Sequence, residues 1–130
     1  MTDAVPQHRT RPVLAVIAAI IAVPVLVLAL YTAAALRVDY SAGQRAGILQ
    51  KFSRRGWICK TWEGELAMTT VPGVAPTLWE FSVRDAAAAD NVSAAVGKRV
   101  VLHYREHRGL PTRCFGETGY FVDSVAIATP

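Results

Sequence analysis

The sequence predicts one membrane-spanning helix followed by a small, mainly-β domain that closes into a five-stranded barrel. Three observations support this fold class. Residues 13–36 form an unbroken run of 24 uncharged, mostly aliphatic residues. The remaining residues, 37–130, contain short alternating or β-branched and aromatic segments, separated by Gly and Pro. One alanine-rich segment follows the third of them and has the composition of a helix.

Residues 13–36 are long enough to cross a bilayer. As a helix they would measure roughly 36 Å, whereas the hydrocarbon core of a membrane is about 30 Å thick. Pro24 lies in the middle of the run and is tolerated in membrane helices, where unwinding in lipid costs more than a kink. We expect the polar residues 1–12 to be a disordered tail and residues 37–45 to be a juxtamembrane linker.

Two other interpretations of the apolar run remain open. A cleaved signal peptide would use Arg9 and Arg11 as its charged region and the small residues Ala33 and Ala35 before its cleavage site. A buried helix of a soluble protein is the other. For a retained anchor, the count of Lys and Arg on the two flanks does not favour a cytoplasmic N-terminus. A short tail before a first helix usually stays inside, however, and long domains translocate largely regardless of charge. We therefore expect the domain to lie outside the cytoplasm.

Five segments have the composition of strands. They are residues 46–52, 57–68, 78–84, 99–106 and 120–128. The clearest is the third, in which Trp79, Phe81 and Val83 share one face. Residues 53–56 between the first two strands have the chemistry of a tight turn and end in Gly56.

The one helix of the domain is predicted over residues 85–96. Asp85 can cap its first turn and Gly97 can close its last. Val92 and Val96, one turn apart, should face the core. The resulting order, β-β-β-α-β-β over residues 46–130, is that of the five-stranded Greek-key barrel known as the OB-fold. An SH3-like barrel and an open sheet with one helix are the alternatives.

The cysteine count allows one disulfide. Cys59 and Cys114 are separated by 55 residues. In an oxidising compartment they would form a bridge, and in the cytosol they would be two buried thiols. No CxxC motif is present, so neither a thioredoxin-like site nor a zinc ribbon is indicated.

Few residues have the pattern of a catalytic or metal site. His103 and His107 lie in and just after a strand and would be about 13 Å apart along it, too far to share one metal ion, so we expect two surface histidines. Glu63 and Glu65 share a strand face about 7 Å apart, but Lys60 and arginines of neighbouring strands can pair with them. GxSxG, GxGxxG and P-loop motifs are missing from the sequence. We therefore expect no enzyme, no cofactor and no metal site.

Binding surfaces are less defined by the sequence. Twelve of the 14 Lys and Arg residues and nine of the ten Asp and Glu residues lie in residues 37–130. The resulting charge of +3 is well short of a nucleic-acid footprint. Trp57, Trp62 and Trp79 are expected to pack in the core and at its rim rather than to stack on bases. Residues 107–119 form a long loop and are the expected contact surface. The candidate contact residues are Lys60, Trp62, Glu63, Glu65, His103 and Arg113.

Three passages carry a resemblance. The runs YSAGQRAGILQKFSRRGWICKTWEGELAM (40–68), WEFSVRD (79–85) and GKRVVLHYREHRGLPTRCFGETGYFV (97–122) follow an apolar helix. Together they resemble a family of small, uncharacterised, single-pass membrane proteins of bacteria. Some members carry the label 6-phosphogluconate dehydrogenase. We set that label aside, because this chain has no dinucleotide fingerprint and is too short for two such domains.

The expected function is a non-enzymatic binding or assembly module of the bacterial cell envelope. It would be a single-pass protein of the inner membrane with a periplasmic domain. Its expected partners are the lipid bilayer and another envelope protein, and not nucleic acid. The alternatives are a small envelope enzyme that uses surface Glu, Lys and His side chains, and an OB-type nucleic-acid binder on the cytoplasmic side.

Overall fold

The computed structural model describes residues 10–68 and 72–128. The chain divides into two compact units, residues 1–34 and 35–130, and each is described by itself. The predicted tail, residues 1–12, lies outside the described residues except for its last three, which belong to a helix.

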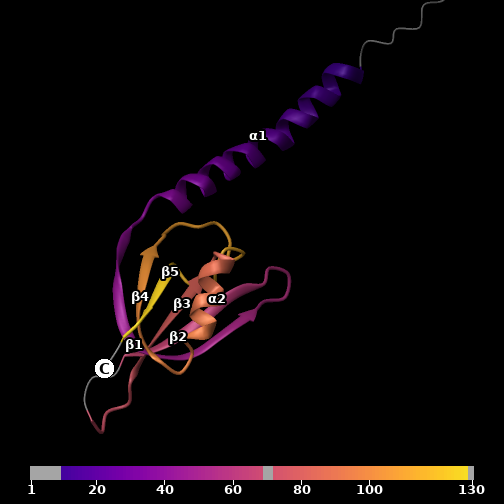
Figure 1. The fold of residues 1–130 in the computed structure, drawn as a ribbon. Helices are drawn as coiled ribbons and strands as arrows, with labels where there is room; N and C mark the ends of the chain where they lie inside the picture. Colours follow the sequence, from indigo (N-terminus) through magenta and orange to yellow (C-terminus); the bar gives the residue numbers. More distant parts are fainter. Residues whose placement is uncertain (1–9, 69–71, 129–130) are drawn as a thin grey trace, which may run out of the picture. The chain divides into compact units, whose positions relative to one another are not determined.

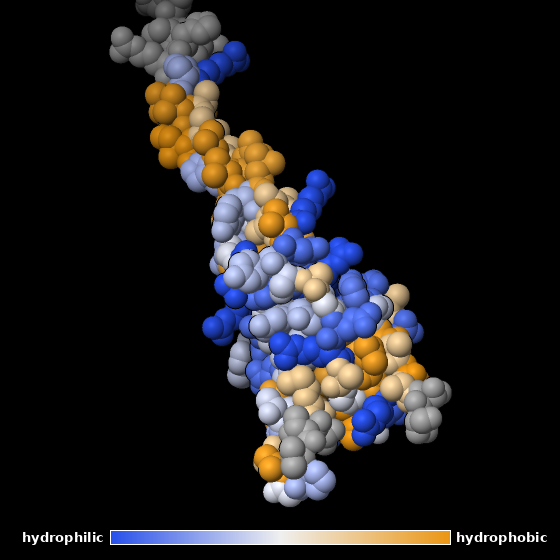
Figure 2. All heavy atoms as spheres, turned by 90° about the vertical axis from the view of Figure 1, so that its left-hand side faces the viewer, coloured by the Kyte–Doolittle hydropathy of each residue, from blue (hydrophilic) through white to orange (hydrophobic). Residues whose placement is uncertain are grey.

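The described part of the first unit is helical and belongs to α1 (Thr10–Arg37), whose last residues, 35–37, are assigned to the second unit (Figure 1). Pro24 lies inside α1 and does not interrupt the helix. The most apolar stretch within residues 11–37 is not buried by any other part of the protein. Figure 2 shows apolar side chains exposed along much of this helix. The chain thus has one N-terminal helix that is long and apolar enough to span a membrane, a property that a signal sequence shares.

The second unit is a five-stranded sheet that closes on itself, so the predicted fold class is confirmed. The strands are β1 (Ser41–Arg55), β2 (Thr61–Met68), β3 (Thr77–Val83), β4 (Arg99–Glu106) and β5 (Tyr120–Ile127), and helix α2 (Ala86–Ala94) follows β3. Around the ring the order is β1-β2-β3-β5-β4. All pairs are antiparallel except β3 with β5, which run parallel and meet at Ser82 and Phe121.

Strand β1 is longer than the sequence indicated. It starts at Ser41 rather than at residue 46 and therefore occupies most of the expected linker. Its first half pairs with β4 and its second half with β2, with an irregularity between Leu49 and Lys51. The first half consists mainly of small and polar residues. Its strand conformation therefore depends on pairing with β4 rather than on a hydrophobic pattern.

The core fills the inside of the barrel. Phe81 and Val83, which alternation placed on one face, are buried there, and Leu49, Leu66 and Leu102 are fully buried as well. Helix α2 begins after Asp85, whose carboxylate accepts hydrogen bonds from two backbone N–H groups of the first turn. The helix packs Val92 into the core but ends earlier than predicted. As a result Val96 lies beyond the helix and is exposed, so its predicted core position is wrong.

Candidate functional site

The turn between β1 and β2 and the loop between β4 and β5 are covalently joined. We call residues 56–60 the tip. Cys59 of the tip forms a disulfide with Cys114 of the 107–119 loop, and the two Cα atoms are 4.9 Å apart. Gly56 turns the chain with a φ of 137°, and a side chain there would overlap the Cys59 carbonyl. The tip is therefore held in one conformation by its backbone and by a cross-link.

An ion pair reinforces this connection. Both Nε and Nη2 of Arg55, the last residue of β1, donate to Glu117 Oε2, at 3.0 and 2.7 Å. The hydrogen bond and the charge of Glu117 raise the pKa of Arg55 above its ordinary value. The two side chains are 45% and 36% exposed. An ion pair this exposed stabilises the fold by only about 0.2–1 kcal/mol. Its contribution to the position of the loop is therefore small.

Beneath the loop lies a buried carboxylate. Glu63 of β2 is only 4% exposed. Its oxygens accept hydrogen bonds from Thr61 Oγ1 and Ser82 Oγ, both at 2.7 Å, and from the backbone N–H of Glu117 at 2.9 Å. Ser82 Oγ in turn accepts from the backbone N–H of Thr118. The buried Glu63 carboxylate therefore anchors the 107–119 loop through hydrogen bonds. The prediction that Glu63 belongs to a contact surface is wrong, because its side chain is buried.

The tip presents two large apolar side chains to solvent. Trp57 is 101% exposed and Ile58 is 97% exposed. The expectation that all three tryptophans pack in the core or at its rim is therefore wrong for Trp57, whereas Trp79 is buried and Trp62 is half-buried. Trp62 lies under the guanidinium of Arg54, 5.0 Å from its ring centre. The tip thus combines an exposed apolar pair with flanking cations.

The candidate contact residues do not form one surface. Lys60 and Trp62 line a shallow pocket of about 260 Å³ that also contains Cys114. Arg113 lies on the far part of the same loop and is exposed. The other residues face elsewhere: Glu65 is half-buried on β2, and His103 on β4 forms an ion pair with Asp123 at 2.8 Å. Of the six candidates, only Lys60 and Trp62 line the same pocket.

The second histidine is buried rather than on the surface. His107 is 6% exposed. Its Nδ1 lies 3.0 Å from the carbonyl oxygen of Val38 and 3.7 Å from Asp39 Oδ1. Its ring packs against Phe121, with 5.4 Å between ring centres. His107 therefore fastens residues 38–39 to the end of β4, and the prediction of two surface histidines is wrong for this one.

The polar groups described above were compared with what a metal site or a substrate pocket requires. Within residues 10–68 and 72–128, no group of three or more His, Cys, Asp or Glu side chains could hold a metal ion. Glu63 and Glu65 border a cavity of about 10 Å³ together with Arg55 and Glu80. A cavity of that size has room for about one water molecule and none for a substrate.

The sequence signals for this site were incomplete. The buried carboxylate has two hydroxyl residues as partners, and nothing in a linear pattern distinguishes it from an exposed strand residue. The exposure of Trp57 had one available signal. It directly follows Gly56, and loop tips lie at the surface. The predicted turn at residues 53–56 is displaced, because Ser53, Arg54 and Arg55 still pair with β2 and the chain turns only from Gly56.

These features define a small OB-type domain that follows an N-terminal apolar helix and has a disulfide-clamped tip. The chain belongs to a family described as a domain of unknown function, DUF8785, whose model matches residues 39–127. A comparison with proteins of curated function gives no match. Neither comparison supports the label 6-phosphogluconate dehydrogenase, which some members of the resembling family have.

One similar solved structure gives independent support for the fold. It is the crystal structure of the mitochondrial single-stranded DNA-binding protein Rim1 of S. cerevisiae. The two chains are 8% identical, with a TM-score of 0.51, and the match covers 69% of this chain and 95% of the other. At this identity the likeness establishes a shared fold and nothing about the ligand.

Proposed function

We propose that this protein is a membrane-anchored, non-enzymatic binding module of the bacterial cell envelope that binds a partner protein through its tip. The observation that carries the proposal is the full exposure of Trp57 and Ile58 on a turn that a disulfide holds still. Burying a large apolar side chain is worth about 1.5–3 kcal/mol, and tryptophan is the residue type most enriched in binding hot spots. Fixing the turn beforehand removes the entropy cost of ordering it on binding.

The Cys59–Cys114 disulfide supports a domain outside the cytoplasm. Structural disulfides persist in oxidising compartments and are rare in the bacterial cytosol. The apolar helix α1 supports retention at the membrane, and a periplasmic domain anchored in the inner membrane satisfies both features. Under this proposal, the bilayer and one envelope protein are the partners.

Nucleic-acid binding is the second candidate, favoured by the likeness to a single-stranded DNA-binding protein. OB-folds bind oligonucleotides over one sheet face, between the loop that joins strands 1 and 2 and the loop that joins strands 4 and 5. In this chain those are the tip and the 107–119 loop, and they are bonded to each other. The bridge closes the gap between them, so we favour a protein partner.

An enzymatic role for the surface Glu, Lys and His side chains is less well supported. Glu63 has three hydrogen-bond donors around its carboxylate, and His103 is engaged with Asp123. A general acid or base must reach the proton it transfers within hydrogen-bond distance. These two side chains are committed elsewhere, so we propose a non-enzymatic module without a cofactor.

Photo-crosslinking in cells tests the proposed function. A photoreactive amino acid replaces Trp57 in the full-length chain, and a matched control carries it at Val74, which is 62% exposed in a different loop. We expect one discrete crosslinked protein from position 57, none from position 74, and loss of the product when Ile58→Ser is added. Equal products from both positions, or none from position 57, would overturn the proposal. A product that contains nucleic acid would favour the second candidate.

A further inference from the structure

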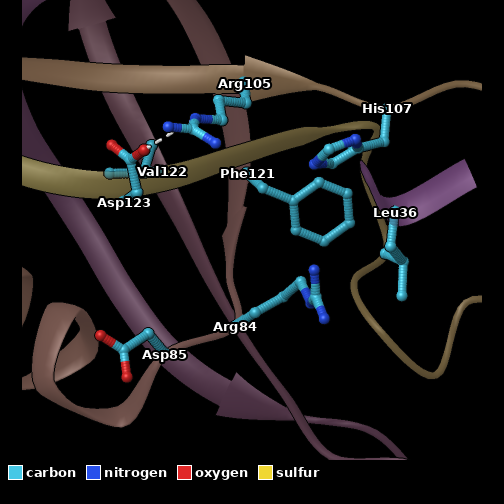
Figure 3. A pocket seen from close by; sticks show the side chains of 8 residues that line it. All are labelled: Leu36, Arg84, Asp85, Arg105, His107, Phe121, Val122 and Asp123. Carbon is cyan, nitrogen blue, oxygen red and sulfur yellow. Dashed lines mark ion pairs between the residues drawn. The ribbon is translucent and has the colours of Figure 1, made fainter. Parts of the chain in front are cut away.

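One cavity of the domain is lined in part by Leu36, the last residue of the apolar run. It has a volume of about 380 Å³, and all of its lining residues belong to the second unit. Leu36 and Phe121 form part of its apolar lining, and Arg84, Arg105 and His107 contribute cationic or polar groups (Figure 3). Leu36 is also the last residue of the uncharged run 13–36.

The residues after the run are tied to the domain, so this position is defined. The backbone N–H of Tyr40 donates to the carbonyl of Glu106 at 2.8 Å. The guanidinium of Arg108 stacks on the Tyr40 ring at 3.6 Å. The Nδ1 atom of His107 lies within hydrogen-bond distance of the carbonyl oxygen of Val38. Residues 38–40, which precede β1, are therefore fixed to the end of β4.

Arg84 is the cation in this cavity whose charge is not compensated. Figure 3 shows its guanidinium directed toward the ring of Phe121, and the two are 5.9 Å apart. The carboxylate of Asp85 points away and caps helix α2. The carboxylate of Asp123 is engaged by Arg105 at 3.3 Å. Among the described residues, no carboxylate lies within ion-pair distance of Arg84.

We propose that this cavity binds the phosphate group of a membrane phospholipid, with Arg84 as the group that holds it. A guanidinium presents several N–H donors in a fixed fork that matches phosphate oxygens. Phe121 and Leu36 offer apolar contact to the first part of the acyl chains, next to the glycerol. This inference rests on the proposed anchoring of the chain by α1, because only then does the end of the apolar run lie at the headgroup level.

Native mass spectrometry of the full-length chain, released from nanodiscs of a single phospholipid, tests the inference. The variants are Arg84→Gln and the matched control Arg99→Gln, an exposed arginine at the opposite end of β4. We expect the wild type and the control to retain one phospholipid. Arg84→Gln should retain it about tenfold less well, as expected for loss of a charge-assisted hydrogen bond. Arg84→Lys should be intermediate, because it keeps the charge but not the fork.

Equal retention by all variants would overturn the inference. The source of the phosphate is tested separately by adding glycerol phosphate to the wild type in lipid-free detergent. Thermal stabilisation by this soluble ester, without lipid retention in nanodiscs, would assign the cavity to a soluble ligand and refute the lipid source. Failure of the chain to enter nanodiscs would instead contradict the proposed anchoring.

Discussion

The disulfide allows a quantitative prediction, in which both cysteines are replaced by serine. Cys59 and Cys114 close a loop of 55 residues. In the chain-entropy model a loop of that length contributes about 4 kcal/mol to the free energy of unfolding at 25 °C, because the cross-link restricts the unfolded chain. The exposed Arg55–Glu117 pair, which joins the same two segments, contributes only about 0.2–1 kcal/mol. The covalent bond therefore dominates the connection.

The assay is thermal and urea unfolding of the full-length protein in detergent micelles, followed by tryptophan fluorescence. Trp79 is buried and reports the loss of the core. For a domain of this size each kcal/mol shifts the midpoint by about 4–8 °C, so the double serine variant should unfold at least roughly 15 °C earlier than the oxidised wild type. The wild type with a reducing agent is the control and should match the variant.

A loss below about 1 kcal/mol in both the variant and the reduced protein would refute this reasoning. It would mean that the unfolded chain already keeps the two segments close without the bond. Agreement between the variant and the reduced protein is required as well. If only the variant lost stability, the serine hydroxyls would be the cause rather than the missing cross-link.

Three further predictions concern the domain. Gly64→Ala places a methyl group against the buried ring of Phe81, and we expect a loss of about 1–3 kcal/mol in urea unfolding. Glu63→Leu removes the acceptor of the part-buried Glu117 N–H and of the Thr61 and Ser82 hydroxyls and should cost about 1–3 kcal/mol, whereas Glu63→Gln keeps an acceptor oxygen and should cost less. Hydrogen bonds from Ser41 and then Arg108 lower the pKa of Glu106 from its ordinary value of 4.5. Its contribution to stability is therefore complete above pH 4.5 and is lost as the pH falls through the lower pKa of the folded state. Ser41→Ala removes the larger cause and should flatten the acid side of a plot of urea midpoint against pH.

The fold was predictable because its signals are local. The strand at residues 78–84 alternates with a period of two, and Asp85 and Gly97 mark the two ends of the helical region between strands. The order of these elements then limits the topology to a few small barrels. The first half of β1 was not predictable, because Ser41–Ala46 has no apolar face and becomes a strand only through its pairing with β4.

The candidate site was less predictable, because its chemistry depends on contacts between distant segments. Glu63 and Glu117 are 54 positions apart in the sequence. The backbone N–H group of Glu117, which donates a hydrogen bond to the Glu63 carboxylate, belongs to a loop with no regular sequence pattern. His107 was expected at the surface because it follows a strand of alternating residues. Its burial comes from Val38 and Asp39, which precede it by almost 70 positions. Linear spacing contains no information on either contact.

The same disulfide has consequences for both the fold and the tip. If Trp57 and Ile58 lay on an unrestrained loop, they would collapse onto nearby apolar surface or interconvert among many conformations, and a partner would have to order them at an entropy cost. The bond between Cys59 and Cys114 prevents both outcomes, because it holds the turn away from the core while the buried Glu63 fixes the loop on the other side of the bond. Reduction should therefore weaken the proposed partner binding even under conditions where the barrel remains folded. In the photo-crosslinking experiment, loss of the product from position 57 in a Cys59→Ser/Cys114→Ser background at a temperature well below the unfolding midpoint would separate the role of the disulfide in presenting the tip from its role in stability.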